Sequence, residues 1–314
     1  MTMADIVTLT PNPAVDLSTS VDRVVPTIKL RCAAPKRNAG GGGVNVARVI
    51  RRFGGEVEAI FPAGGFTGQI LRQLIDDEAI PYRCIEVAAE TREDFAVSEL
   101  RTAKQYHFVT PGSPLHEPEW SSCLERLAAT APRPMFVIGS GSLPPGVPST
   151  FYARAAELAT ALGARFAVDT SGAPLAAALE HGVYLIKPNL REFCDLAGAT
   201  LASEHEWIAA ARRYIDSGKV EIVALSLGHL GAFLIARDQT LRARPLAINP
   251  VSSVGAGDSF LGALMFTLAN GASLADALRL GVAAGTAALM NEGTELCHPS
   301  DAYRLSAQVT IERV

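Results

Sequence analysis

Cysteine is scarce in this chain, with five residues among 314, and no two of them form a Cys-x-x-Cys pair. The six histidines are dispersed as well, and no His/Cys/Asp cluster has the spacing of a zinc site. The sequence therefore predicts free thiols in a reduced, cytoplasmic protein without structural zinc.

Long apolar runs and blocks of positive charge are also missing. No run of about 18 or more apolar residues is present to span a bilayer, and the opening MTMADIVTLTPNP lacks the features of a secretory signal. The formal net charge is −4, so nucleic acid and membrane surfaces are poor candidate partners.

Two common phosphate-binding motifs are absent. The chain contains no Gly-x-x-x-x-Gly-Lys-Ser/Thr loop, and no Gly-x-Gly-x-x-Gly follows its first predicted strand. These absences exclude a P-loop protein and count against an NAD-linked enzyme.

The chain does contain a repeated alternation of apolar strands and helical patterns. Strand patterns cover residues 6–10, 57–63, 135–139, 165–169, 183–187 and 221–227, and helical patterns cover residues 44–53, 67–77, 149–162 and 204–217. This alternation predicts an α/β fold with a mostly parallel central sheet flanked by helices on both faces. In such sheets ligands bind beyond the carboxyl ends of the strands.

Two segments interrupt this alternation. Residues 16–37 and 92–109 are strand-like, more polar and without a helix signal, and DFAVSEL and QYHFV could pair as a hairpin. We expect the two segments to form a small β-sheet lid outside a core of residues 1–15, 38–91 and 110–314. Edge strands of the main sheet are the alternative.

Four consecutive glycines, Gly40 to Gly43, precede the first predicted helix and Asn45. Glycines let a backbone approach a ligand closely, and the Asn45 amide can donate to and accept from a sugar hydroxyl. A turn without any ligand accounts for the same glycines.

A second stretch of small residues, SSVGAGDSF, opens an apolar helix near the end of the chain. Uncovered backbone N–H groups at Gly255, Ala256 and Gly257 would bind an anion. Asp258 in the first turn could take a proton from an alcohol, as in phosphoryl transfer, and the helix dipole favours its ionised form. An acid at this position also stabilises a helix without any catalytic role.

Three further motifs follow predicted strands. In KPNLRE, Asn189 and Glu192 share a helix face and suit magnesium through water, or they form a capping box. The glycine-containing turn after Ser226 could hold a nucleotide or simply reverse the chain. Ser142 lies in SGSLPPG, where a ligand could sit at the end of a strand.

Together these motifs resemble the PfkB group of the ribokinase-like sugar kinases over essentially the whole chain. GGGVNVA, from Gly41 to Ala47, matches the first family signature, and SSVGAGDSFLGA, from Ser252 to Ala263, matches the second. Ser253 replaces the usual threonine and keeps the hydroxyl. The resemblance implies a Rossmann-like, ribokinase-like fold, ATP and Mg²⁺ as cofactors, and a lid that makes a homodimer.

The resemblance also implies roles for individual residues. Asp258 would be the catalytic base, and the amides of Gly255, Ala256 and Gly257 would form the anion hole. Residues implied at the ATP site are Lys187, Asn189, Ser226, Gly228 and Gly231. Residues implied around the sugar are Asp16, Gly41, Gly42, Asn45 and Ser142. Residues implied at metal sites are Asn189 and Glu192 for Mg²⁺, and Ser252, Val254 and Asn291 for K⁺.

The resemblance narrows the substrate as well. In the phosphofructokinase branch the positions matching Lys29 and Arg92 grip the sugar phosphate, although lid cations can also be merely solvated. Where 1-phosphofructokinases and tagatose-6-phosphate kinases commonly read Gly-Lys-Gly, this chain has Gly41 to Gly43, which is similar to the minor 6-phosphofructokinases. The implied reaction is phosphoryl transfer from ATP to fructose 6-phosphate, giving fructose 1,6-bisphosphate. The alternatives are those two other kinases and a non-catalytic sugar-phosphate sensor.

Overall fold

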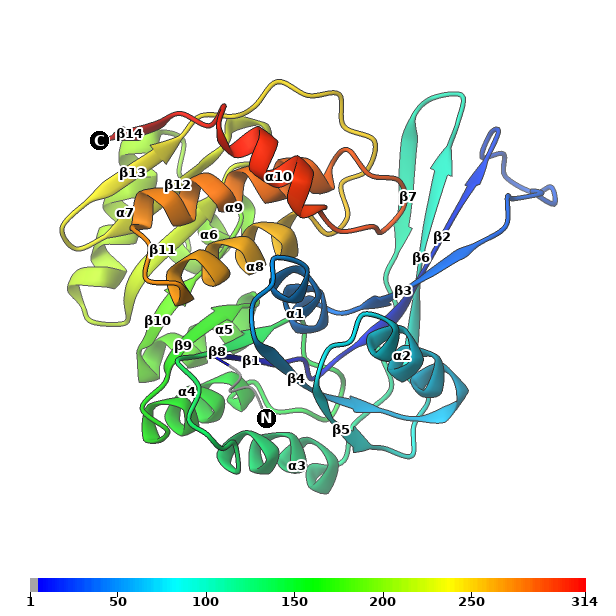
Figure 1. Cartoon of the computed structure of the whole chain (residues 1–314), viewed down its shortest axis with the longest axis horizontal. Helices are drawn as coiled ribbons and strands as arrows, with labels where there is room; N and C mark the ends of the chain where they lie inside the picture. Colours follow the sequence, from blue (N-terminus) through cyan, green and yellow to red (C-terminus); the bar gives the residue numbers. More distant parts are fainter. Residues whose placement is uncertain (1–4) are drawn as a thin grey trace.

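A computed structural model describes residues 5–314 and contains two separate β-sheets (Figure 1). The strands of the large sheet are β1 (Ile6–Leu9), β4 (Val57–Ala63), β5 (Tyr82–Glu86), β8 (Phe136–Ser140), β9 (Arg165–Asp169), β10 (Val183–Ile186), β11 (Val220–Ser226), β12 (Ala232–Ala236), β13 (Thr240–Ala243) and β14 (Ile311–Arg313). Their order is β14-β13-β12-β11-β10-β9-β8-β1-β4-β5. From β11 to β5 all neighbours are parallel, so their carboxyl ends share one edge of the sheet.

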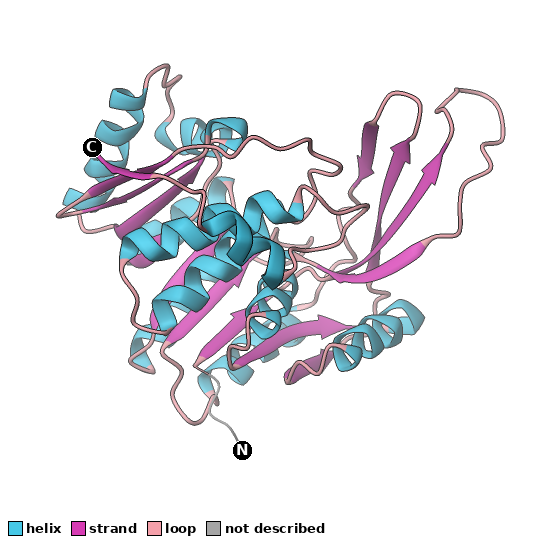
Figure 2. Ribbon diagram, turned by 45° about the horizontal axis from the view of Figure 1, so that its top comes forward, coloured by secondary structure: helices cyan, strands magenta, loops and turns pink. Residues whose placement is uncertain are grey.

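Helices cover both faces of the large sheet (Figure 2). One face carries α1 (Gly42–Arg52), α2 (Gly65–Asp77), α8 (Ala256–Ala269), α9 (Leu274–Ala288) and α10 (Pro299–Ser306). The other carries α3 (Glu117–Ala128), α4 (Phe151–Ala161), α5 (Gly172–His181), α6 (Leu190–Ala197) and α7 (Glu204–Asp216). In β1, Ile6 packs into the first core and Val7 and Leu9 into the second, because successive side chains of a strand point to opposite faces.

The predicted α/β fold with a mostly parallel sheet is confirmed, with most element ends shifted by one or two residues. The reversal of the chain after Ser226, one of the two interpretations of that turn, is confirmed as the antiparallel pair of β11 and β12. The extension of this antiparallel edge by β13 and β14 was not predicted. The edge begins where the chain reverses through a short 3-10 turn, Gly228–Leu230, directly after β11. A reversal this tight brings the next strand back antiparallel, whereas a parallel neighbour needs a long crossover.

The small sheet has the order β3-β2-β6-β7, and it projects from the helical core in both views (Figures 1 and 2). Its strands are β2 (Ala14–Val21), β3 (Lys36–Gly40), β6 (Arg92–Glu99) and β7 (Lys104–Phe108). The predicted hairpin is confirmed as the antiparallel pair of β6 and β7. The alternative, edge strands of the main sheet, is wrong. Parallel pairing of β2 with β6 places Asp16 beside Asp94.

The structure describes all five cysteines and the lengths of the helices. All five cysteines are free, as predicted. Between residues 5 and 314, no helix is both long and apolar enough to cross a lipid bilayer.

Candidate active site

The two glycine-rich segments meet where α1 and α8 pack side by side. The Asn45 Nδ2 donates to Asp258 Oδ2 at 2.9 Å, across 213 residues of sequence. The helices can approach closely because Gly262 faces Val49, where an added Cβ would lie 2.7 Å from the valine Cβ. The small residue Gly262 thus lets α8 approach α1, so that Asp258 reaches the Asn45 amide.

The start of α8 leaves its backbone donors uncovered. Gly255 is the N-cap in a left-handed conformation, with φ of 76°, and no side chain of the described residues caps the helix. Glycine adopts this conformation without steric cost. The first N–H groups of α8 therefore remain available to an anion, beside the Asp258 carboxylate.

The surroundings of Asp258 act on its acidity in both directions. Burial raises the pKa of Asp258 above its ordinary value, whereas the Asn45 hydrogen bond and the charges of Lys187 and Arg48 pull it back. The sequence suggested only the stabilising helix dipole, because burial cannot be read from the local motif. A partly desolvated carboxylate is a better proton acceptor than a fully hydrated one.

Lys187, one residue beyond β10, is buried beside the start of α8. Its Nζ lies 3.1 Å from Asp169 Oδ2 and 3.4 Å from the position of an added Cβ on Gly257. Burial lowers the pKa of Lys187, but the carboxylates of Asp169, Asp258 and Glu192 outweigh it and hold the pKa above its ordinary value. Burial raises the pKa of Asp169 to about 6, and Lys187 opposes that rise. Lys187 is thus a fixed positive charge at the anion site.

A cavity of about 770 Å³ opens against this charge. All five residues that the resemblance implied for ATP line it, namely Lys187, Asn189, Ser226, Gly228 and Gly231. Its volume lies within the range of small-molecule sites, about 300–1,000 Å³. The α8 residues Ala256 and Gly257 line the same cavity, so a phosphate chain bound there could reach the uncovered amides.

The apolar part of this cavity was not predicted from the sequence. It comes from Leu246 and Ile248, in the connection before α8, and from Val282 and Leu289, at α9 and its end. Such residues suit the flat faces of a nucleotide base. Their local sequence gives no signal, because Leu, Ile and Val fill cores throughout the chain.

Asn189 and Glu192 form the capping box that was one of the two interpretations. The Glu192 N–H donates to Asn189 Oδ1 and the Asn189 N–H donates to Glu192 Oε2, both at 2.9 Å. In residues 5–314 no three His, Cys, Asp or Glu side chains group to hold a metal ion. The carboxylates of Glu192, Asp169 and Asp258 nevertheless all act on Lys187. A single carboxylate such as Glu192 is enough for Mg²⁺, which keeps water and phosphate ligands and uses few protein carboxylates.

Asp16 lies in β2 close enough for the charge of Asp258 to act on it, and only 6% of it is exposed. Burial and the neighbouring Asp94 raise the pKa of Asp16 to about 7, against the charges of Arg48 and Arg92. Gly40 faces Asp16 across the strand pair, and a side chain at Gly40 would overlap the carboxylate. Asp16 and Asn45, which we call the polar wall, thus both lie near Asp258, and their binding of sugar hydroxyls stays a prediction.

The glycine loop, Gly40 to Gly43, packs against the carboxyl ends of strands in the large sheet. Gly41 has φ of 96°, and an added Cβ would lie 2.8 Å from Pro13 Cα. A side chain at Gly42 would overlap Ser140 Oγ at the end of β8. Ser142 Oγ accepts a hydrogen bond from Asn12 Nδ2 at 3.1 Å. The loop therefore packs against the strand ends as closely as glycine permits.

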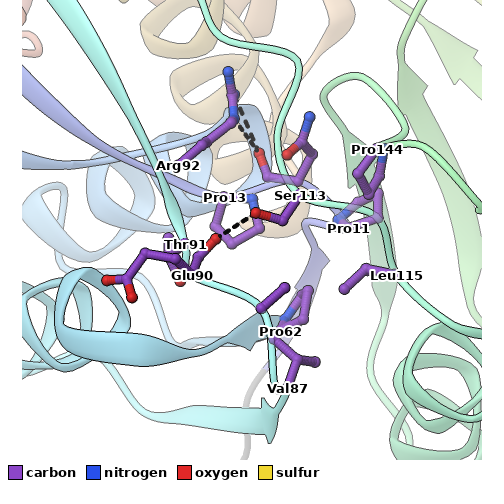
Figure 3. A pocket seen from close by; sticks show the side chains of 12 residues that line it. Pro11, Pro13, Pro62, Val87, Glu90, Thr91, Arg92, Ser113, Leu115 and Pro144 are labelled. Atoms are coloured by element: carbon purple, nitrogen blue, oxygen red, sulfur yellow. Dashed lines mark hydrogen bonds between the residues drawn. The ribbon is translucent and has the colours of Figure 1, made fainter.

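Arg92, at the start of β6, is engaged by the protein itself, and Figure 3 shows it among the residues that line a small pocket. It pairs with Asp94 Oδ2 at 2.7 Å and donates to the carbonyl oxygens of Thr110 and Asn12. The cavity beside it holds only about 30 Å³, room for a water molecule. In this conformation the guanidinium positions the start of β6.

Lys29 lies apart from these residues. It is exposed in the connection of residues 22–35, which leaves the small sheet at the end opposite to Gly40 (Figure 1). The structure therefore does not bring Lys29 and Arg92 together within one chain, and their shared grip on a phosphate stays a prediction.

The residues implied for K⁺ lie in two adjoining loops. Ser252 Oγ donates to the Gly293 carbonyl at 2.7 Å and accepts from the Val254 N–H at 3.2 Å. The Asn291 Nδ2 donates to the Leu296 carbonyl at 2.8 Å. Hydroxyl and carbonyl oxygens are suitable ligands for a monovalent cation, so the donor chemistry fits.

Two residues of the site escaped the sequence analysis. Asp169 ends an apolar strand at the ligand-binding edge, and that signal could have found it. Arg48 has no such signal, because an arginine in a helix is ordinary until its complete burial is known.

Comparison with known proteins agrees with this geometry. The model of the pfkB family carbohydrate kinases matches residues 7–301. The chain belongs to this family. The resemblance seen in the two glycine-rich signatures is therefore confirmed, and the protein is a phosphotransferase of the carbohydrate kinase type.

Individual members of the family match this chain over almost its whole length. The chain is 46% identical to ATP-dependent 6-phosphofructokinase isozyme 2 of Mycobacterium tuberculosis, covering 95% of this chain and 88% of the relative. It is 40% identical to the Escherichia coli protein of the same name, covering 98% and 100%. A crystal structure of Escherichia coli phosphofructokinase-2 with fructose-6-phosphate matches with a TM-score of 0.92 and 38% identity, covering 98% of this chain and 99% of that one.

Proposed function

We propose that this kinase transfers the γ-phosphoryl group of ATP to the primary hydroxyl of fructose 6-phosphate. The observation that carries the proposal is the position of Asp258. It accepts a hydrogen bond from Asn45, and it directly follows Ala256 and Gly257, which line the nucleotide-sized cavity beside the uncovered amides of α8. The two relatives named 6-phosphofructokinase isozyme 2 support fructose 6-phosphate as the acceptor.

In the proposed mechanism Asp258 acts as general base. The sugar hydroxyls bind Asp16 and Asn45, which directs the free primary hydroxyl at Asp258. Asp258 takes the hydroxyl proton as the oxygen attacks the γ-phosphorus, and ADP leaves. The hydrogen bond from Asn45 fixes the carboxylate in position.

The remaining residues stabilise charge. The amides of Gly255, Ala256 and Gly257 and the Lys187 ammonium face the transferred group, where negative charge must be held during transfer. Mg²⁺, held through Glu192, Asn189 and Asp169, would neutralise charge on the phosphate oxygens when bound. We extend K⁺ binding at Ser252, Val254 and Asn291 to this chain from the Escherichia coli enzyme, whose structure was solved with potassium.

The small sheet serves in this proposal as a lid over the sugar. Segments 16–37 and 92–109 form the lid, and residues 1–15, 38–91 and 110–314 form the core, of which residues 1–4 lie outside the described part of the structure. Lid movement would free Arg92 from part of its internal bonding and let it bind the sugar phosphate with Lys29. Closure would also exclude water and limit ATP hydrolysis.

The outer face of the small sheet supports a homodimer. Phe95 and Phe108 are a cross-strand pair that is 41% and 58% exposed, next to Leu17 of β2. Paired exposed aromatics on one sheet face favour a protein interface. A cytoplasmic location completes the proposal and is supported by the free cysteines.

The test is the initial rate of ADP formation with Mg-ATP and a panel of acceptors. The panel contains fructose 6-phosphate, fructose 1-phosphate, tagatose 6-phosphate, fructose and ribose. We expect the highest kcat/KM with fructose 6-phosphate. A preference for fructose 1-phosphate would instead favour the activity named for more distant relatives, such as the 33% identical 1-phosphofructokinase of Xanthomonas campestris. Binding without turnover would favour a sensor.

A further inference from the structure

Arg48 is a fully buried arginine one helical turn from Asn45, and nothing in the proposed mechanism uses it. Its side chain is 1% exposed. The Nη1 donates to Asn45 Oδ1 at 3.2 Å and to the Ala39 carbonyl at 2.7 Å, and the Nε donates to Glu78 Oε1 at 2.6 Å. The guanidinium therefore connects the catalytic side of α1 with the end of α2.

The Asn45 amide has two ends, and only one suits Asp258. A carboxylate accepts hydrogen bonds, so the Nδ2 must face Asp258 while the Oδ1 needs a donor. Arg48 is that donor. Since an arginine cannot accept a hydrogen bond, it excludes the flipped amide, in which Oδ1 would oppose the carboxylate.

We propose that Arg48 is a positioning residue for phosphoryl transfer, which holds Asn45 in the orientation that directs Asp258 and the sugar hydroxyl. This inference rests on the proposed function. Through the Ala39 carbonyl, Arg48 also fixes the peptide that leads into the glycine loop beside Asp16. One buried cation thus contacts two parts of the acceptor site, Asn45 and the peptide of Ala39.

A purely structural role is the competing explanation, and Arg52 supplies the control. Arg52 lies one turn further along α1 and bonds the same Glu78, with Nε to Oε2 at 3.1 Å, and it bonds Glu295 at 2.7 Å. It makes no hydrogen bond with Asn45. Arg48→Met and Arg52→Met both break an ion pair with Glu78, but only the first removes the donor to Asn45.

The experiment measures kcat, KM and the pH dependence of kcat/KM for the wild type, R48M, R48K and R52M. Thermal midpoints of all four are measured alongside. The charged or titratable groups around Asp258 and Arg48 are Lys187, Asp169, Asp16, Asp94, Arg92 and Glu78. Arg52 also acts on Glu78. Apart from position 48 or 52 itself these groups are unchanged in every variant, so differences between the pH profiles report on the substituted position.

We expect R48M and R48K to lower kcat about tenfold or more, the size of a lost hydrogen bond to a charged group, with little change in the KM for ATP. In R48M the acid limb of kcat/KM should also move to higher pH, because the Arg48 charge lowers the pKa of Asp258. R48K keeps the charge, so its acid limb should stay in place. R52M should lose stability but keep the wild-type kcat and profile.

Kinetics of R48M and R48K equal to those of R52M would overturn the inference and leave Arg48 with a structural role. If R48M does not fold, R48K decides, since its charge opposite Glu78 is retained and its kcat alone tests the geometry. A wild type that phosphorylates none of the acceptors contradicts the proposed function instead. The two failures are therefore distinguishable.

Discussion

Asp16 and Asp258 show how the same side chain acquires different properties within one site. Burial raises the pKa of both. Asp258 accepts a hydrogen bond from Asn45 and lies near Lys187, and both favour its charge, whereas Asp16 lies beside a second carboxylate, Asp94, which disfavours it. The acid proposed for proton transfer thus has two neighbours that favour its charged form, and the acid proposed for sugar binding has a pKa of about 7.

A pH-dependent stability follows from Asp16. Its folded pKa of about 7 lies above the ordinary 3.8, so the folded protein binds the extra proton between these values and loses stability as pH rises through that range. Asp16→Asn removes this contribution. We expect the free energy of unfolding of the ligand-free wild type to fall between pH 5 and pH 8 by about 2 kcal/mol more than that of D16N. Urea unfolding at both pH values measures it.

Equal pH slopes for the two proteins would show that Asp16 is ionised throughout. Asp169, whose pKa is raised to about 6, adds the same slope to both proteins. The comparison therefore isolates Asp16.

At the scale of elements, Glu192 at the start of α6 forms a capping box and is proposed to hold Mg²⁺. One substitution separates these two roles. Gln at the third helical position preserves a capping box but carries no charge for a metal. Glu192→Gln should therefore change the free energy of unfolding by less than about 0.5 kcal/mol while raising the Mg²⁺ concentration for half-maximal rate several-fold. Rate measurements across a Mg²⁺ titration, with urea unfolding, provide both values.

The chain contains a matched control for this prediction. Ser203 and Glu206 form the same capping box at the start of α7, outside the nucleotide cavity. Glu206→Gln should leave the Mg²⁺ dependence unchanged. If E192Q behaves like E206Q, Glu192 is a cap and has no part in metal binding.

The sequence predicted the elements well where chemistry is concentrated in contiguous residues. The start of α8 and the capping box of α6 are both short motifs, and the structure has both. The outer strands of the antiparallel edge, β13 and β14, and the apolar side of the nucleotide cavity were missed because segments without a local motif build them. Arg48 was missed for a related reason: its significance depends on burial between α1 and α2, which only the packed fold defines.

At the scale of the whole molecule, the small sheet presents an apolar surface that the single chain leaves uncovered. Phe108→Glu would place a charge in the proposed interface. We expect the wild type to sediment as a dimer and F108E as a monomer at the same concentration. Sedimentation velocity measures this directly.

Phe66→Glu is the control, because it replaces an exposed aromatic residue with an acid outside the proposed interface. Phe66 is 80% exposed at the start of α2, outside the small sheet, so F66E should remain dimeric. Dimers in all three proteins would place the interface on another surface. A monomeric wild type would contradict the proposed homodimer.

The whole-molecule arrangement was predictable only in outline. Two polar, strand-like segments indicated a separate sheet, and the structure has one. The position of Lys29 was not predictable, because a sequence motif does not show which end of a sheet a connection leaves. The proposed phosphate grip of Lys29 and Arg92 would therefore require movement or assembly of the small sheet.

The most direct test of the account is Asp258→Asn. Asparagine keeps the size of the side chain and an oxygen to accept from Asn45, but it cannot take the proton. We expect kcat with fructose 6-phosphate to fall by about 10²–10⁴-fold, the usual contribution of a general base. The Kd for Mg-ATP, measured by calorimetry, should stay within about threefold of the wild type, a change of less than about 1 kcal/mol in binding free energy. A variant that retains most of the wild-type rate would contradict the central claim that Asp258 is the base.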